Sequence, residues 1–274
     1  MGLSRHFSKV VIDCNTSALC FASSLVPAFR TNSILKVVQS TRRYSSRTFL
    51  TMNTSTFGGG SGIVIPPQRA PGKQPATIVF LHGLGDTANG WAPAFPIPGL
   101  EYAKVVLPTA HHIPVTLNMG MTMPAFFDLY GLEADSRVDE AGIHKGIARI
   151  DRIVQEEVSK GVDRNRIVVG GFSQGGALAL RYALEEGNVG GVVGLSCWLP
   201  GGKDKVGNAR RLPKVLMCHG DEDMVVRFKY GKKTADVLKE NGADVEFKVF
   251  RGMGHSSCPE ELQVISKFLQ SVLE

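Results

Sequence analysis

A single serine, Ser173, stands in the stretch Gly171-Phe172-Ser173-Gln174-Gly175, which matches the pattern G-x-S-x-G. This pattern is typical of a sharp turn that joins a buried strand to a helix and exposes the serine hydroxyl. Such a turn strains the backbone at the serine, so the residues two positions away must be small, and both are glycine. A serine hydroxyl also needs a base that takes its proton and donors that stabilise the resulting oxyanion.

Two later segments supply an acid and a base. Residues 217–226 close a predicted strand and include Asp221 and Asp223, whereas residues 252–258 precede the last predicted helix and include His255. The carboxyl ends of parallel strands meet at one edge of a sheet, so these side chains can reach Ser173. The chain order serine, acid, histidine also fits a nucleophile of this type. We therefore expect His255 to be the general base, oriented by either Asp221 or Asp223.

The oxyanion donors are expected to be backbone N–H groups. The stretch His82-Gly83-Leu84-Gly85 follows the first strand of the body, and its glycines allow the chain to approach a substrate oxygen. We expect the N–H groups of Leu84 and Gln174 to act together. The alternative is an ordinary glycine-rich turn capped by Asp86. His82 and His219 are expected to make structural hydrogen bonds.

The elements that must position these residues alternate along the chain. Apolar runs predict strands at residues 76–82, 103–108, 166–171, 190–197, 214–220 and 245–250. Helices are predicted around residues 143–158, at 175–184, at 228–241 and from Pro259 onward, with Gly242 ending the third. Several runs lack alternation, as in strands that are buried on both faces. The predicted fold class is α/β, with a mainly parallel sheet between helices on both faces.

The first 52 residues differ in composition from the rest of the chain. They hold seven of the 31 basic residues and one of the 25 acidic residues, so they carry the whole net charge of +6. We assign residues 1–57 to an N-terminal extension and residues 58–274 to a single catalytic domain. The extension resembles a mitochondrial or plastid transit peptide, with a disordered segment and a secretion signal as alternatives. Because the body is neutral, we expect no nucleic-acid ligand.

The five cysteines form no CxxC pair and show no metal-ligand spacing. Three of them lie in the body, an odd number that argues against a disulfide framework and fits a reduced compartment. We expect no metal and no organic cofactor. No sequence feature sets the oligomeric state, and we expect a monomer or a weak homodimer.

Residues 114–132 are crowded with flexible apolar side chains. Such side chains adapt to an acyl chain, whose methylenes contribute about 0.8 kcal/mol each when buried. The alternative is that many of them belong to the core. Asp128, in the same segment, is expected at the surface or as a loop-fixing acceptor. The candidate substrate-binding residues here are Leu117, Met119, Met121, Met123, Phe126 and Phe127.

Six segments together resemble the acyl-protein thioesterase family, also called lysophospholipase I-like or carboxylesterase type 2. They are "FLHGLGDT", "VTLNM", "GGFSQGGALAL", "LSCWLP", "CHGDED" and "GMGHSSC", in that order, and the resemblance covers residues 62–274. Two positions depart from the family pattern: Met224 stands where proline is usual and Phe126 where tryptophan is usual.

The resemblance implies an α/β-hydrolase fold without a separate large lid domain, and a cytoplasmic catalytic body. It implies Ser173 as nucleophile, His255 as base and Asp223 as the acid, with Leu84 and Gln174 as oxyanion donors. It also places Trp91 and Trp198 near the site, and we add Trp198 to the candidate substrate-binding residues. The implied activity is removal of palmitoyl groups from S-acylated proteins. The alternative is a lysophospholipase or short-chain carboxylesterase that acts on acyl lipids. A non-catalytic protein that binds apolar ligands is the third hypothesis. Peripheral contact with membranes fits both hydrolases.

Overall fold

The structure is a computed structural model that describes residues 11–13, 53–57, 60–68, 70–95, 97–132, 136–206 and 212–274. Its strands are β1 (Val11–Asp13), β2 (Asn53–Phe57), β3 (Gly60–Ile65), β4 (Ala76–Leu81), β5 (Ala103–Pro108), β6 (His112–Val115), β7 (Met121–Pro124), β8 (Ile167–Phe172), β9 (Gly191–Leu195), β10 (Lys214–Gly220) and β11 (Val245–Arg251). Its helices are α2 (Ala88–Trp91), α3 (Glu140–Ser159), α4 (Gln174–Glu185), α5 (Phe228–Glu240) and α6 (Pro259–Leu273). Most of the predicted transit segment lies outside the described residues.

Nine of the described strands form one sheet in the order β1-β11-β10-β9-β8-β4-β5-β3-β2. Strands β4, β5, β8, β9, β10 and β11 pair in parallel, and β3 pairs antiparallel with β5 and β2. The six strands predicted from apolar runs are these six parallel strands, so that prediction is confirmed. Strand β2 precedes residue 58, and the domain boundary at this residue stays a prediction.

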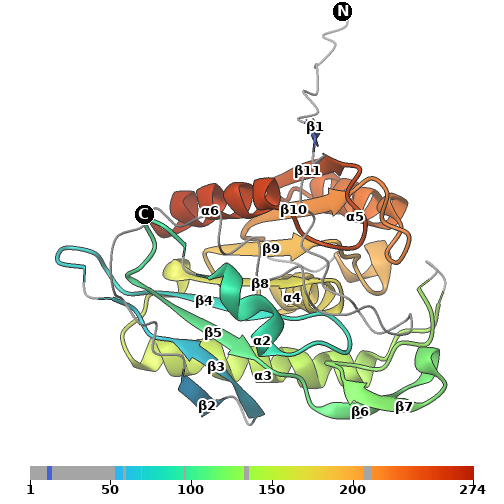
Figure 1. The fold of residues 1–274 in the computed structure, drawn as a ribbon, viewed down its shortest axis with the longest axis horizontal. Coiled ribbons are helices and arrows are strands. Elements are labelled where there is room, and N and C mark those ends of the chain that lie inside the picture. The colour runs from blue at the N-terminus through green and yellow to red at the C-terminus, as the bar shows by residue number, and fades with distance from the viewer. Residues whose placement is uncertain are drawn as a thin grey trace, which may run out of the picture.

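Helices cover both faces of the sheet (Figure 1). One core cluster joins side chains of α3, α4 and α5 to one face, and a second joins α2 and α6 to the other. In β4, Val79 and Leu81 belong to the first cluster, whereas Ile78 and Phe80 belong to the second. This double burial explains why the strand reads as an unbroken apolar run, because neither of its faces meets water.

The helix ends follow from local chemistry, and two of them, at Gly242 and Pro259, were predicted. Helix α3 begins after Asp139, whose Oδ1 accepts a hydrogen bond of 3.0 Å from the N–H of Gly142. Helix α6 begins at Pro259, as predicted. Helix α5 ends at Glu240, and Gly242 adopts a φ of +85°, which is the left-handed conformation expected of a glycine that ends a helix.

The segment between β5 and α3 was not predicted in detail. Its strands β6 and β7 pair antiparallel as a hairpin, and the described residues after it run as a loop toward α3 rather than forming a separate domain. Figure 1 shows this hairpin beyond one end of the sheet. Asp128 fixes its base, because its carboxylate accepts hydrogen bonds from the N–H and the hydroxyl of Thr116 at 2.7 and 2.6 Å. The expectation of a loop-fixing acceptor is therefore confirmed.

Candidate active site

Ser173 lies at the turn between β8 and α4. Its φ of +53° and ψ of −118° place it in a strained conformation that L-residues rarely adopt. A Cβ on Gly171 would lie 2.4 Å from the backbone carbon of Gly175, and a Cβ on Gly175 would lie 2.4 Å from the carbonyl oxygen of Leu81. Both flanking positions therefore require glycine, and the strain at Ser173 is held by close backbone packing.

The structure brings Ser173, His255 and Asp223 into one chain of contacts. Nε2 of His255 lies 3.0 Å from Oγ of Ser173, and Nδ1 lies 2.8 Å from Oδ2 of Asp223. An ionised carboxylate only accepts hydrogen bonds, so Nδ1 carries the proton and Nε2 is free to accept one from the serine. This arrangement makes the serine hydroxyl able to transfer its proton to His255 as Oγ attacks a carbonyl.

Asp223 rather than Asp221 reaches the histidine. The other carboxylate oxygen of Asp223 accepts hydrogen bonds of 2.9 Å from the N–H groups of Val225 and Val226. Burial alone would raise the pKa of Asp223, but hydrogen bonds from His219 and His255 outweigh it and lower the pKa to about 2. Asp221 is exposed and accepts from the N–H of Gly252 at 2.8 Å.

Two backbone N–H groups remain open beside the nucleophile. Among the described residues, neither the N–H of Leu84 nor that of Gln174 has a hydrogen-bond partner within the protein. Gln174 is the first residue of α4, so its N–H also lies at the positive end of a helix. Leu84 lies in the turn after β4 that includes Gly85, whose N–H donates to the carbonyl of Pro124 at 2.9 Å.

His82 supports this turn from within the core. The N–H of Ala110 donates to Nε2 of His82 at 2.9 Å, and Nδ1 of His82 lies 2.6 Å from the carbonyl oxygen of Gly83. Nδ1 therefore carries the proton and donates it to Gly83. Burial lowers the pKa of His82 to about 4, so the ring is neutral at neutral pH. His82 thus makes the structural hydrogen bonds that were predicted for it.

The candidate substrate-binding residues separate into three groups. Met119 and Met121 are 90% and 51% exposed on the hairpin. Leu117, Met123 and Phe126 are partly buried against the core. Phe127, which is 2% exposed, and Trp198, which is partly buried, line a cavity. Trp91 is buried by packing, with its ring 4.7 Å from that of Phe80 and 5.5 Å from that of Phe172.

The cavity has walls from three parts of the chain. We call residues 127–129, 131–132 and 136–139 the first wall and residues 198–202 the second wall. The third wall is the face of α5 that carries Tyr230, Lys233, Thr234 and Val237. The hydroxyl of Thr234 accepts a hydrogen bond of 2.9 Å from the N–H of Leu199, which joins the second and third walls. Ser173 does not line the cavity, but Phe127, which does, accepts a hydrogen bond of 2.8 Å at its carbonyl from the side chain of Gln174, the residue after Ser173.

A family model described as phospholipase/carboxylesterase matches residues 64–273. The chain belongs to this family. Among curated relatives of this phospholipase/carboxylesterase family member, acyl-protein thioesterase 1 of Mycosarcoma maydis is 42% identical over 233 residues, which cover 77% of this chain and 96% of the relative. Acyl-protein thioesterase 1 of Gibberella zeae is 41% identical over 219 residues, which cover 74% and 93%.

Solved structures give the same assignment. The crystal structure of Zea mays acyl-protein thioesterase 2 is 33% identical with a TM-score of 0.66, covering 77% of this chain and 98% of that one. The structure of Arabidopsis thaliana SOBER1 is 30% identical with a TM-score of 0.69, covering 73% and 100%. The family match and these neighbours confirm the predicted α/β-hydrolase fold of this phospholipase/carboxylesterase family member.

Sequence reasoning missed several residues of the site. The face of α5 that forms the third wall was missed because a helical pattern shows which residues share a face but not what the face contacts. The sequence analysis also missed the side chain of Gln174, because the G-x-S-x-G pattern assigns a role only to the backbone N–H of this residue. Among the residues that the structure describes, no three His, Cys, Asp or Glu side chains gather where they would hold a metal ion.

Proposed function

We propose that this protein is a serine hydrolase that cleaves long-chain acyl thioesters and removes palmitoyl groups from S-acylated cysteines of proteins. The observation that carries the proposal is the contact chain from Ser173 through His255 to Asp223 in a member of this family. Relatives about 40% identical over most of the chain are named acyl-protein thioesterases, which supports the thioester as substrate.

The first half of the reaction forms an acyl-serine. His255 takes the hydroxyl proton of Ser173 at Nε2 while Oγ attacks the thioester carbonyl carbon. The carbonyl oxygen becomes an oxyanion, which the N–H groups of Leu84 and Gln174 stabilise by hydrogen bonds. The carbon–sulfur bond then breaks, the cysteine thiolate leaves and takes a proton from His255, and the acyl group stays on Ser173.

The second half releases the fatty acid. Water enters where the thiol left, and His255 takes one of its protons as its oxygen attacks the acyl-serine carbonyl. The same two N–H groups receive the second oxyanion, and Ser173 leaves with the proton that His255 returns. Asp223 stays ionised throughout, because its pKa of about 2 keeps it negative beside the charged imidazole.

A lysophospholipase or short-chain carboxylesterase remains the second candidate, because the matching family is described as phospholipase/carboxylesterase and the same three residues serve an oxygen ester. A non-catalytic binding protein is the third.

Two measurements separate these three candidate functions. A fluorophosphonate probe should label the wild-type protein and not Ser173→Ala; an unlabelled wild type would favour the non-catalytic reading. Hydrolysis of an S-palmitoylated peptide is then compared with that of lysophosphatidylcholine, and a higher kcat/KM for the lipid would overturn our first choice.

We also propose that the face bearing the hairpin touches membranes. Met119, Met121 and Met224 are 90%, 51% and 81% exposed, which is unusual for large apolar side chains. The hairpin that carries Met119 and Met121 follows the carboxyl end of β5, and Met224 follows that of β10, so both segments leave the sheet at the edge that bears Ser173. Among the described residues no helix is long and apolar enough to cross a bilayer.

For the N-terminal segment we propose an organellar targeting role, with residues 58–274 as the catalytic domain. The basic, acid-poor and serine-rich composition of residues 1–52 supports this. Sequencing the N-terminus of the purified native protein tests it, because a start near residue 45 indicates processing and a start at Met1 argues against it.

A further inference from the structure

The side chain of Gln174 binds the backbone on both sides of the Phe126-Phe127 pair, where the first wall begins. Its Oε1 accepts a hydrogen bond of 2.9 Å from the N–H of Phe126, and its Nε2 donates to the carbonyl of Phe127 at 2.8 Å. The residue is fully buried. Because the N–H of the same residue lies beside Ser173, the nucleophile turn and the start of the first wall are joined through one amino acid.

A hydrogen bond joins the start of the first wall to its end, where α3 begins. The N–H of Asp128 donates to Oδ2 of Asp139 at 2.9 Å, while Oδ1 of Asp139 caps α3. The first wall is therefore bound at its start by Gln174, the first residue of α4, and ends at Asp139, the residue that caps α3.

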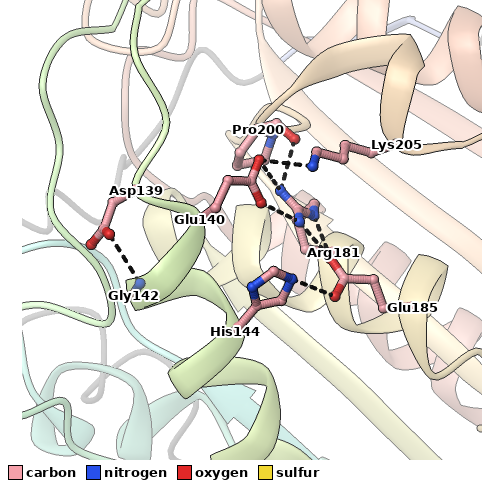
Figure 2. Close-up of polar contacts among 8 residues, drawn as sticks. All are labelled: Asp139, Glu140, Gly142, His144, Arg181, Glu185, Pro200 and Lys205. Atoms are coloured by element: carbon pink, nitrogen blue, oxygen red, sulfur yellow. Dashed lines mark hydrogen bonds and ion pairs between the residues drawn. The ribbon is translucent and has the colours of Figure 1, made fainter.

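Arg181, two turns further along α4, joins the end of the first wall to the second wall (Figure 2). Its Nη2 lies 2.8 Å from Oε2 of Glu140, the residue after Asp139, and its Nη1 donates to the carbonyl of Pro200 at 3.3 Å. Its Nε donates to Glu185 at 2.9 Å. The three partners lie on α3, on the second wall and on α4 itself.

The charges of this cluster are balanced, and its central arginine is withdrawn from water. The side chain of Arg181 is 1% exposed, and Lys205 contacts Glu140 at 2.9 Å, so two cations face the carboxylates of Glu140 and Glu185. Figure 2 shows His144 beside Glu185, and its Nε2 lies 3.3 Å from the carboxylate of Glu185. A planar guanidinium can hold several acceptors at fixed angles, which an ammonium group cannot do. The cluster therefore sets a defined separation between α3 and residue 200.

We propose that Gln174 and Arg181 are positioning residues through which helix α4 sets the width of the cavity, and thereby the preference for long acyl chains. The inference rests on the proposed function and extends it from the reaction to its chain-length selectivity. Gln174 fixes where the first wall begins relative to Ser173, and Arg181 fixes how far its end lies from the second wall. Because Ser173 does not line the cavity, an acetyl group on it is too short to fill the cavity, and we expect its hydrolysis not to depend on this width.

The test compares Gln174→Met and Arg181→Lys with the wild type on p-nitrophenyl acetate and p-nitrophenyl palmitate. Gln174→Met keeps the backbone N–H and most of the side-chain volume but loses both hydrogen bonds to the first wall. Arg181→Lys keeps the positive charge but loses the planar guanidinium that contacts Glu140, Pro200 and Glu185 together. For Arg181→Lys we expect KM for the palmitate to rise at least 10-fold with kcat within 3-fold, and kcat/KM for the acetate to stay within 3-fold. For Gln174→Met, whose backbone N–H is an oxyanion donor, we expect kcat/KM to fall at least 10-fold more for the palmitate than for the acetate.

The experiment includes a neutral variant, a measurement of folding and a replacement variant. Gln155→Met, on the exposed face of α3, should leave both substrates unchanged. Thermal unfolding is measured for each variant, and if Arg181→Lys does not fold, Lys205→Met replaces it, because it removes only the outer contact to Glu140. Equal losses on both esters, or no loss on the palmitate, would overturn the proposal. A wild type that hydrolyses neither ester would instead refute the proposed function.

Discussion

Nε2 of His219 lies 3.4 Å from Oδ2 of Asp223. The same oxygen contacts Nδ1 of His255 at 2.8 Å, so two imidazoles face one carboxylate. His219 is fully buried and also donates from Nε2 to the carbonyl of Val226 at 2.8 Å. The acid is therefore oriented from two sides, by its backbone donors and by a second histidine that does not touch the nucleophile.

Replacing His219 by phenylalanine keeps a ring in this position and removes the donor. We expect kcat to fall about 10-fold, because Asp223 loses one of the groups that orient it. The pKa of Asp223 should rise from about 2 toward its ordinary value of 3.8. Steady-state kinetics at pH 7 on the S-palmitoylated peptide measure the first effect.

Stability as a function of pH measures the second effect of His219→Phe. A carboxyl whose pKa is lower in the folded state adds stability above its unfolded pKa, and this stability is lost as the pH falls through the folded pKa. The variant should therefore be less stable than the wild type by roughly 1 kcal/mol at pH 7 from this linkage alone, and the difference should narrow between pH 4 and pH 2. Urea unfolding across this range gives the difference; a constant difference would contradict a role through Asp223.

The two neighbouring aspartates should differ sharply in their effect on catalysis. Asp223→Asn removes the charge that stabilises the imidazolium and should lower kcat by about 10⁴-fold. Asp221→Asn alters only a loop contact to Gly252 and serves as the matched control, with an expected change below about 3-fold. Both variants are assayed on the S-palmitoylated peptide. Comparable losses in the two variants would mean that the loop as a whole, rather than the contact to His255, governs the rate.

The sequence was enough to predict the parallel strands and the three contacting residues. Strands such as β4 are buried on both faces, so their composition reports their environment directly. Ser173, Asp223 and His255 each follow a predicted strand, and the rule that these strand ends share one edge brings them together without coordinates. The choice between Asp221 and Asp223 needed the family resemblance, because both are within reach in sequence terms. The contact of 2.8 Å to His255 identifies Asp223 independently.

The walls of the cavity could not be predicted in this way. Gln174 and Phe127 are 47 residues apart, and their hydrogen bond depends on how the segment after β7 folds back onto the nucleophile turn. Met119 and Met121 were predicted as substrate-binding residues, yet both are exposed on the hairpin. Composition shows that such residues are apolar and flexible, whereas the backbone path decides which surface they meet.

The exposed methionines give a prediction about membrane binding. Burying a methionine side chain contributes about 1.5–3 kcal/mol, so replacing Met119, Met121 and Met224 together by serine should weaken binding to phosphatidylcholine vesicles at least 10-fold. Co-sedimentation with vesicles measures the bound fraction. Thr122→Ser, on the same hairpin, is the matched control and should bind as the wild type does. Equal sedimentation of the triple variant and the wild type would show that this face does not meet the bilayer.

A buried acid, Glu261 on α6, predicts an unusual dependence of stability on pH. The residue is fully buried, and neither carboxylate oxygen has a hydrogen-bond partner among the described residues. Burial raises its pKa from 4.5 to about 8. Between these two pH values the folded state keeps a proton that the unfolded state has released. The stability of the wild type should therefore fall as the pH rises from about 4.5 through 8.

Glu261→Gln has nearly the same shape and does not titrate, so it should escape this loss. We expect the variant and the wild type to unfold at similar temperatures at pH 5, and the variant to unfold on the order of 5 °C higher at pH 9. Calorimetry at pH 5, 7 and 9 gives the three differences. Glu240→Gln, at the exposed end of α5, controls for the loss of a carboxylate and should show a constant difference. The difference in unfolding temperature between Glu261→Gln and the wild type could instead stay constant or shrink as the pH rises. That result would mean that Glu261 is ionised in the folded protein and would contradict its raised pKa.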